Sequence, residues 1–145
     1  MTARTGKGDR LREAGFTLVE LLVVLAIIAL IASIAAPQVL RYLGSARSGT
    51  ALAQIRNIES ALELFYVDNG RYPTGEEGLT ALTSPPASAA RWNGPYLKNT
   101  SALNDPWGRP YLYETGDKAL VIRSLGRDGK PDGTGEDRDI SNQST

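Results

Sequence analysis

The chain has 145 residues, with 16 basic and 16 acidic side chains, and it contains neither cysteine nor histidine. Zero net charge gives no support to a nucleic-acid-binding face held by bulk electrostatics. The missing residue types exclude thiol nucleophiles, Ser-His-Asp triads, ordinary zinc sites and stabilising disulfides. The length that remains after the N-terminal segment is enough for one small domain rather than two.

The first predicted element is an apolar helix close to the N-terminus. Residues 21–40 carry no charge, and a helix of about 20 residues spans roughly 30 Å, which matches the core of a bilayer. Basic residues outnumber acidic ones in front of this run, so the positive-inside rule places the rest of the chain across the membrane. Arg41 and Arg47 on that far side weaken the bias.

Three ordinary readings of the run compete. A buried core helix is disfavoured by the length, and a removable secretory signal, for which Ser33-Ile34-Ala35 offers small residues, has an apolar region of only about 7–15 residues. A plain signal anchor explains the length but not Glu20, because a carboxylate near the start of a membrane helix costs a few kcal/mol unless it lies at the interface or finds a partner.

The residues Gly15-Phe16-Thr17-Leu18-Val19-Glu20, behind a short basic leader, resemble the class III signal of type IV pilins and related pseudopilins. The resemblance implies that a membrane-embedded prepilin peptidase cuts after Gly15 and methylates the new N-terminus at Phe16. The freed amine of Phe16 would then pair with Glu20 of a neighbouring copy in an assembled filament. Removing one partner of such a buried pair leaves the other uncompensated, at a cost of about 3–5 kcal/mol.

This signal predicts how the chain is divided. Residues 1–15 form a leader peptide, residues 16–40 a transmembrane and filament-core helix, and residues 41–145 a periplasmic head that includes the amphipathic half of the helix. Pro37 is expected to interrupt or kink the helix, since proline lacks a backbone donor and clashes with the preceding turn.

Beyond Pro37 the sequence predicts a second helical stretch that packs on the head. Apolar residues recur at steps of three and four, which is typical of one buried helix face: they are Ala51, Ile55, Ile58, Leu62 and Phe65. The stretch is expected to end at Asn69-Gly70, where a glycine can adopt the left-handed C-cap conformation.

The remaining residues predict a small α+β head. Thr74 and Glu77 have capping-box spacing for a short helix through Leu79 and Leu82. A proline-bearing loop with Trp92 and Tyr96 follows, and then two strands, DPWGRPYLYE and KALVIRSL, joined by a turn at residues 115–117. The fold class is therefore α+β, and the resemblance implies a pilin-like fold in which a long N-terminal helix packs on a small antiparallel sheet. The strand residues available to cover the helix are Tyr111, Tyr113, Leu120 and Ile122.

The head sequence sharpens the resemblance. The runs YPT, EGL, GPYL and DPWG, in this order from Tyr72 to Gly108, are similar to the major pseudopilin of type II secretion systems. Type IV pilins usually close a C-terminal region with a cysteine pair, which is missing here.

The resemblance implies a structural subunit without catalytic residues. It would enter the inner membrane as a single-pass precursor with its head in the periplasm, and then polymerise with copies of itself into a filament that drives folded proteins across the outer membrane. Expected partners are the prepilin peptidase and methyltransferase, minor pseudopilins and an inner-membrane assembly platform. The alternatives are a type IV pilus subunit for adhesion, motility or DNA uptake, and a membrane-anchored binding or enzymatic domain, for which no spacing of polar residues gives support.

The C-terminal segment contains five acidic residues among several glycines, namely Asp128, Asp132, Glu136, Asp137 and Asp139. Hard oxygen ligands on such a loop suit calcium rather than a transition metal, although a solvated loop is the commoner reading of composition alone. An EF-hand is rejected, because Lys130 occupies the third ligand position and no room remains for an exit helix.

The resemblance implies a structural calcium site at this loop. Its ligands would be the backbone carbonyl of Leu125 and the carboxylates of Asp128, Asp137 and Asp139. Asp132 departs from similar sequences, which tend to have glycine there, and ligation by Asp132 or Glu136 is left open.

Overall fold

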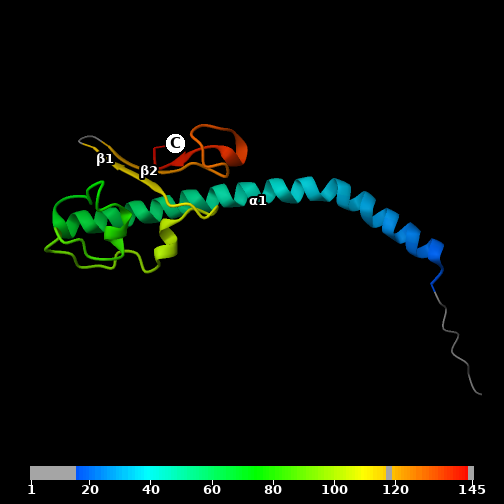
Figure 1. Ribbon diagram of the computed structural model, residues 1–145, viewed down its shortest axis with the longest axis horizontal. Coiled ribbons are helices and arrows are strands. Elements are labelled where there is room, and N and C mark those ends of the chain that lie inside the picture. Colours follow the sequence, from blue (N-terminus) through cyan, green and yellow to red (C-terminus); the bar gives the residue numbers. More distant parts are fainter. Residues whose placement is uncertain (1–15, 117–118, 144–145) are drawn as a thin grey trace, which may run out of the picture. The chain divides into compact units, whose positions relative to one another are not determined.

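The computed structural model describes residues 16–116 and 119–143 (Figure 1). Helix α1 spans Leu18–Asn69, and three short 3-10 helices follow at Leu79–Leu82, Thr100–Leu103 and Gly135–Asp137. The strands are β1, Leu112–Thr115; β2, Leu120–Ser124; and β3, Ile140–Ser141. The chain divides into two compact units, Met1–Val39 and Leu40–Thr145.

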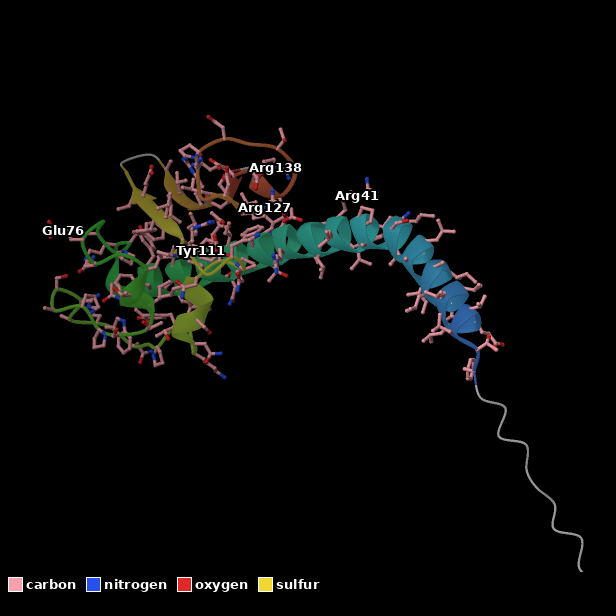
Figure 2. All side chains as sticks on the ribbon, turned by 45° about the vertical axis from the view of Figure 1, so that its right-hand side comes forward. Arg41, Glu76, Tyr111, Arg127 and Arg138 are labelled. Atoms are coloured by element: carbon pink, nitrogen blue, oxygen red, sulfur yellow. The ribbon has the colours of Figure 1, made fainter. Side chains whose placement is uncertain are left out.

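The first unit is the N-terminal part of α1. By length and composition α1 can cross a membrane, and none of its most apolar window is buried. Figure 2 shows its side chains radiating from the helix along this stretch. The large apolar side chains there, from Leu18 to Ile34, are all exposed, as expected for a surface that is covered by lipid or by other helices.

Pro37 lies inside α1, and the residues on both sides of it are helical. The helix therefore continues through the proline rather than ending there. A kink at Pro37 stays a prediction.

In the second unit, the C-terminal part of α1 packs on the sheet. The buried positions match the predicted stripe, since Ile55, Ile58, Leu62 and Phe65 are fully buried. Tyr111 donates its hydroxyl proton to Gln54 Oε1 at 2.7 Å, and Asn142 donates to Glu59 Oε1 at 3.1 Å. The helix ends at Asn69, and Gly70 adopts a left-handed φ of 73°, as the sequence predicts.

The sheet is antiparallel, with strand order β1-β2-β3. Tyr113 of β1 is opposite Ile122 of β2, and Ser124 of β2 is opposite Ile140 of β3. Because side chains alternate between the two faces of a strand, Ile122 and Ser124 both reach the buried side. The third strand was not predicted from the sequence, since only two of its residues pair.

A buried acid joins the loop before β1 to the sheet. Asp105 is only 6% exposed and accepts hydrogen bonds from the backbone N–H groups of Trp107 and Arg109 at 3.1 and 2.9 Å. Ser124 donates its hydroxyl proton to the same carboxylate at 2.6 Å. These bonds give the DPWG run a structural role, because they satisfy a carboxylate that would otherwise be costly to bury.

The predicted capping-box hydrogen bonds between Thr74 and Glu77 are formed. They close a turn ahead of the short helix, which is a 3-10 helix that begins at Leu79 and has no side-chain cap. The N–H of Thr74 donates to Glu77 Oε2 at 2.8 Å, and the N–H of Glu77 donates to Thr74 Oγ1 at 3.2 Å. Glu77 also binds Arg71 with two hydrogen bonds of 2.7 and 2.8 Å, and Ser88 donates to it. This network fixes the segment that leaves α1.

Candidate assembly and cation-binding sites

Three residues of the pilin-like signal lie at or just before the N-terminal end of α1. The side chain of Phe16 is exposed, and so is Glu20 in the first turn of α1. Thr17 precedes the helix and accepts a hydrogen bond from the Glu20 N–H at 3.2 Å, while its hydroxyl lies 3.5 Å from Glu20 Oε2. Gly15, the other cleavage-site residue, lies outside the described residues.

Thr17 and Glu20 thus form a capping arrangement that was not predicted from the sequence. The signal was present in the Thr-x-x-Glu spacing, which is the same as at Thr74 and Glu77. The capping contact is local and weak at 3.5 Å, so the Glu20 carboxylate keeps the capacity to accept a stronger, charged donor.

One of the predicted calcium ligands, Asp137, is already paired with a positively charged side chain of the same loop. Arg127 Nε and Nη2 donate to the two carboxylate oxygens of Asp137 at 2.9 and 3.0 Å. Glu136 lies 3.6 Å from the same guanidinium. Hydrogen bonding and then charge from Asp137, followed by the charge of Glu136, raise the pKa of Arg127. A divalent ion that used Asp137 would have to compete with this arginine.

The other predicted ligands are differently placed. Asp139 Oδ1 is buried and has no hydrogen-bond partner within the part of the chain that the structure describes, which is a costly state unless a cation or water reaches it. Asp128 is exposed, and its Oδ1 accepts a hydrogen bond from the Lys130 N–H at 3.1 Å. Leu125 is half-buried. Within residues 16–116 and 119–143, no three acidic side chains converge on one point.

The residues of the loop therefore suit calcium by their chemistry, but they are not gathered around a common point. All the candidate ligands supply oxygen, and Asp139 has an oxygen in need of a partner. The carboxylate of Asp137 is occupied by its ion pair with Arg127. Asp132 has a φ of 67°, a left-handed conformation that aspartate tolerates better than most residues but glycine adopts freely.

Arg109 and a close backbone contact hold this loop in place. Arg109 donates to the carbonyl oxygens of Gly126 and Arg127 at 2.7 and 2.6 Å. Gly126 has a φ of 65°, and a Cβ there would lie 2.8 Å from the carbonyl oxygen of Glu136. The two halves of the loop can approach this closely only because residue 126 has no side chain.

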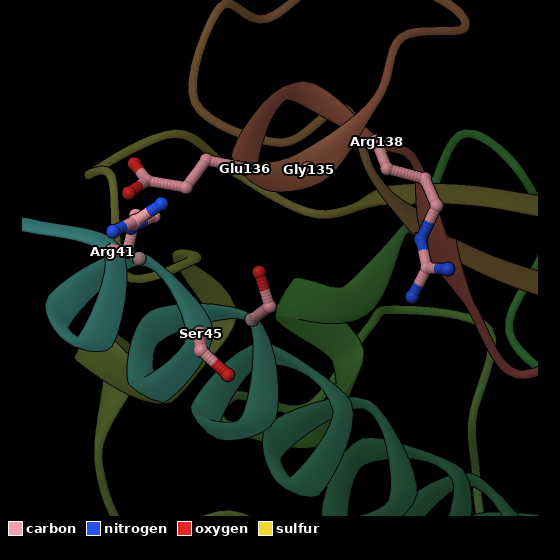
Figure 3. A pocket seen from close by; sticks show the side chains of 7 residues that line it. Arg41, Ser45, Gly135, Glu136 and Arg138 are labelled. Carbon is pink, nitrogen blue, oxygen red and sulfur yellow. The ribbon is translucent and has the colours of Figure 1, made fainter. Parts of the chain in front are cut away.

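A surface pocket separates the loop from α1. It has a volume of about 380 Å³. Figure 3 shows Arg41 and Ser45 on the α1 wall, and Glu136 and Arg138 on the opposite wall. Glu136 reaches back to the helix at Gly44, where a Cβ would fall 1.7 Å from Glu136 Oε1. The pocket residues are Arg41, Gly44, Ser45, Ser48, Gly135, Glu136 and Arg138.

Comparisons with known proteins agree on one family. The family described as "Type II secretion system (T2SS), protein G" matches residues 38–143, and the "Prokaryotic N-terminal methylation motif" matches residues 10–36. The type II secretion system core protein G of Pseudomonas aeruginosa is 38% identical over 140 residues, which cover 92% of this chain and 97% of that relative. The Vibrio cholerae protein of the same name is 37% identical, covering 90% of this chain and 92% of that protein.

A solved structure gives the same answer for the fold. The crystal structure of the major pseudopilin from the type 2 secretion system of enterohaemorrhagic Escherichia coli matches with a TM-score of 0.58 and 33% sequence identity. The match covers 70% of this chain and 90% of that chain. It confirms the predicted fold of a long N-terminal helix on a small antiparallel sheet.

These matches favour the secretion pseudopilin over the type IV pilus subunit. The relatives span nearly the whole chain, and the family is one of structural subunits. Its N-terminal methylation motif implies prepilin processing and assembly into a pseudopilus. The protein belongs to the type II secretion system protein G family and is a major pseudopilin.

Proposed function

We propose that this pseudopilin is inserted in the inner membrane as a single-pass precursor with its head in the periplasm, and that it is then extracted into a filament made of its own copies. Minor pseudopilins and an inner-membrane assembly platform are the expected partners. Growth of the filament drives folded proteins across the outer membrane, and no residue of the chain has a catalytic role.

One observation supports this proposal most directly. The N-terminal part of α1 exposes a continuous apolar surface, preceded by a methylation motif and interrupted by the single carboxylate of Glu20. In a membrane or a filament core that carboxylate requires a cation. Cleavage between Gly15 and Phe16 would create one, the α-amine of Phe16.

The order of events follows from this chemistry. Before cleavage the nitrogen of Phe16 is part of a peptide bond and cannot carry a charge. After cleavage the amine of one copy can bind Glu20 of the next, which fixes the axial offset between neighbouring helices. The pair would therefore make assembly depend on cleavage, and it would set the register between neighbouring subunits.

The mass of the intact protein in the membrane fraction tests the processing step. The proposal predicts a chain that begins at Phe16 with one added methyl group, and a chain that still begins at Met1 when the prepilin peptidase is absent. A chain beginning at Met1 in the presence of an active peptidase contradicts the proposal.

We further propose that the C-terminal loop binds a structural calcium ion. The ligands would be the Leu125 carbonyl and the carboxylates of Asp128, Asp137 and Asp139. When bound, calcium would neutralise these carboxylates and link the last segment of the chain to β2. The buried, unpartnered Oδ1 of Asp139 supports the proposal, and Arg127 must release Asp137 for that residue to contribute.

A further inference from the structure

The pocket between α1 and the C-terminal loop contains two arginines whose charges are not used elsewhere. Among the described residues, the guanidinium groups of Arg41 and Arg138 form no hydrogen bond and no ion pair. The pocket's carboxylate, Glu136, lies 3.6 Å from Arg127, which offsets its charge. The pocket is therefore lined by two available cations and one partly neutralised anion.

The same pocket contains two available hydroxyl groups. Elsewhere on α1, Ser33, Thr50 and Ser60 donate their hydroxyl protons to backbone carbonyls three or four residues earlier. Ser45 and Ser48 line the pocket and make no such bond within the part of the chain that the structure describes. Guanidinium and hydroxyl donors together are the groups that recognise a phosphate.

The position of the pocket along the sequence indicates a membrane source for a phosphate ligand. Arg41 directly follows the uncharged run of residues 21–40. The headgroup layer adds about 5–8 Å to each side of the hydrocarbon core. At about 1.5 Å per residue, the helical turn from Arg41 to Ser45 falls within that layer.

We propose that this pocket binds the phosphate of a membrane phospholipid while the subunit is held in the bilayer, with Arg41 and Arg138 as its cationic contacts. The proposal rests on the membrane-anchored precursor described above. The pocket's volume of about 380 Å³ lies at the lower end of the usual range of about 300–1,000 Å³ for small-molecule sites, as suits a headgroup. The proposal also explains why basic residues occur on the side of the membrane where the positive-inside rule disfavours them.

Native mass spectrometry of the full chain tests the proposal. The chain is released from nanodiscs that contain equal amounts of phosphatidylglycerol and a diacyl galactolipid, which lacks phosphate. We expect the parent chain to retain phosphatidylglycerol with a preference of about tenfold over the galactolipid. The double variant R41Q/R138Q should lose this preference. E136Q, which removes the one carboxylate among the described residues that line the pocket, should strengthen it.

The matched control is R47Q. Arg47 lies on the same helix within two turns of Arg41, is exposed and does not line the pocket. R47Q therefore removes one positive charge, half of the change in the double variant, without altering the pocket. R47Q should retain the parent's preference. An equal fall in R47Q and R41Q/R138Q would show general attraction to the membrane and overturn the pocket. The melting temperature of the double variant should equal the parent's, because neither guanidinium has a bonded partner among the described residues.

Other outcomes also decide the question. Binding of inorganic phosphate in detergent without retention of phosphatidylglycerol would assign the pocket to a free anion and overturn the lipid proposal. Loss of chain dimers rather than of lipid in R41Q/R138Q would assign it to a carboxylate of a second copy, with the same consequence. Failure of the parent to enter nanodiscs would contradict the membrane-anchored precursor itself, whereas entry with unchanged lipid preference in R41Q/R138Q contradicts only the headgroup site.

Discussion

The carboxylate of Glu136 rests on the bare α-carbon of Gly44, where a Cβ would lie 1.7 Å from Oε1. Gly44 is for this reason the first buried residue of α1. The contact joins two segments that are more than 90 residues apart in the sequence and seats the C-terminal loop on the helix.

A double-mutant cycle measures this contact. Alanine favours a helix interior over glycine by about 0.8–1.0 kcal/mol, but in G44A the Glu136 side chain has to move aside. We expect G44A alone to give little or no stabilisation, and G44A to add about 1 kcal/mol in the background of E136A. Thermal unfolding of the detergent-solubilised chain gives the four values. Additivity of the two changes within about 0.3–0.5 kcal/mol would show that the residues are not coupled.

Calcium and Arg127 should compete for Asp137. A chelator is expected to lower the melting temperature of the chain and added calcium to restore it, because the ion would neutralise carboxylates that otherwise repel each other. R127Q should bind calcium more tightly than the parent in a calorimetric titration, since Asp137 is then free. D139N should lose most of the calcium response.

The control for this titration is R123Q, which removes one positive charge from β2 and leaves the ion pair with Asp137 intact. R123Q should bind calcium as the parent does. A melting temperature that is unaffected by both chelator and calcium contradicts the site, and equal calcium affinity in R127Q and the parent contradicts the competition.

Asp132 is predicted to cost stability through its backbone. Its φ of 67° is a left-handed conformation that costs an ordinary L-residue about 1–2 kcal/mol and glycine very little. D132G should therefore raise the melting temperature by an amount equivalent to about 0.5–1 kcal/mol. D132A should lower it. A loss of calcium affinity in D132G would instead identify Asp132 as a ligand.

Glu77 should make the stability of the head depend on acid pH. Hydrogen bonds from Arg71 are the largest cause that lowers the pKa of Glu77 to about 2, against about 4.3 in an unfolded chain. Because the folded pKa is the lower one, the stabilisation is fully present above about pH 5 and is lost as pH falls toward 2.

The variant E77Q isolates this effect. It should be less stable than the parent by about 1–3 kcal/mol at neutral pH, and the gap should shrink as the pH falls from 5 to 2. E76Q is the matched control. Glu76 is an exposed neighbour (Figure 2) whose side chain makes no hydrogen bond among the described residues. The stability of E76Q should therefore follow the parent's at each pH. A gap between E77Q and the parent that is constant with pH contradicts the account.

The sequence predicted what depends on local pattern. The spacing of Ile55, Ile58, Leu62 and Phe65 identified the buried face of α1, because a helix of 3.6 residues per turn brings such positions into line. The capping box of Thr74 with its glutamate and the left-handed end of α1 likewise follow from residues a few positions apart.

What the sequence could not provide are pairs made by tertiary folding. Nothing near Gly44 in the sequence indicates that a glutamate from the C-terminal loop would cover it, and the burial of Asp105 depends on Ser124 from a later strand. The sequence indicates oxygen ligands in the acidic loop but does not reveal that an arginine binds one of them. The pairing of Arg127 with Asp137 requires the loop to fold back at Gly126.

The central claim, that the amine of Phe16 pairs with Glu20 of the next copy, is tested by comparing E20Q with T17A. T17A removes the capping arrangement at the start of α1, whereas E20Q keeps an acceptor oxygen for it and removes the charge. After mass spectrometry has verified cleavage and methylation in both variants, the measurement is the amount of sedimentable filament per cell. The account predicts filaments for T17A and almost none for E20Q. Filaments in E20Q at the level of the parent would contradict it.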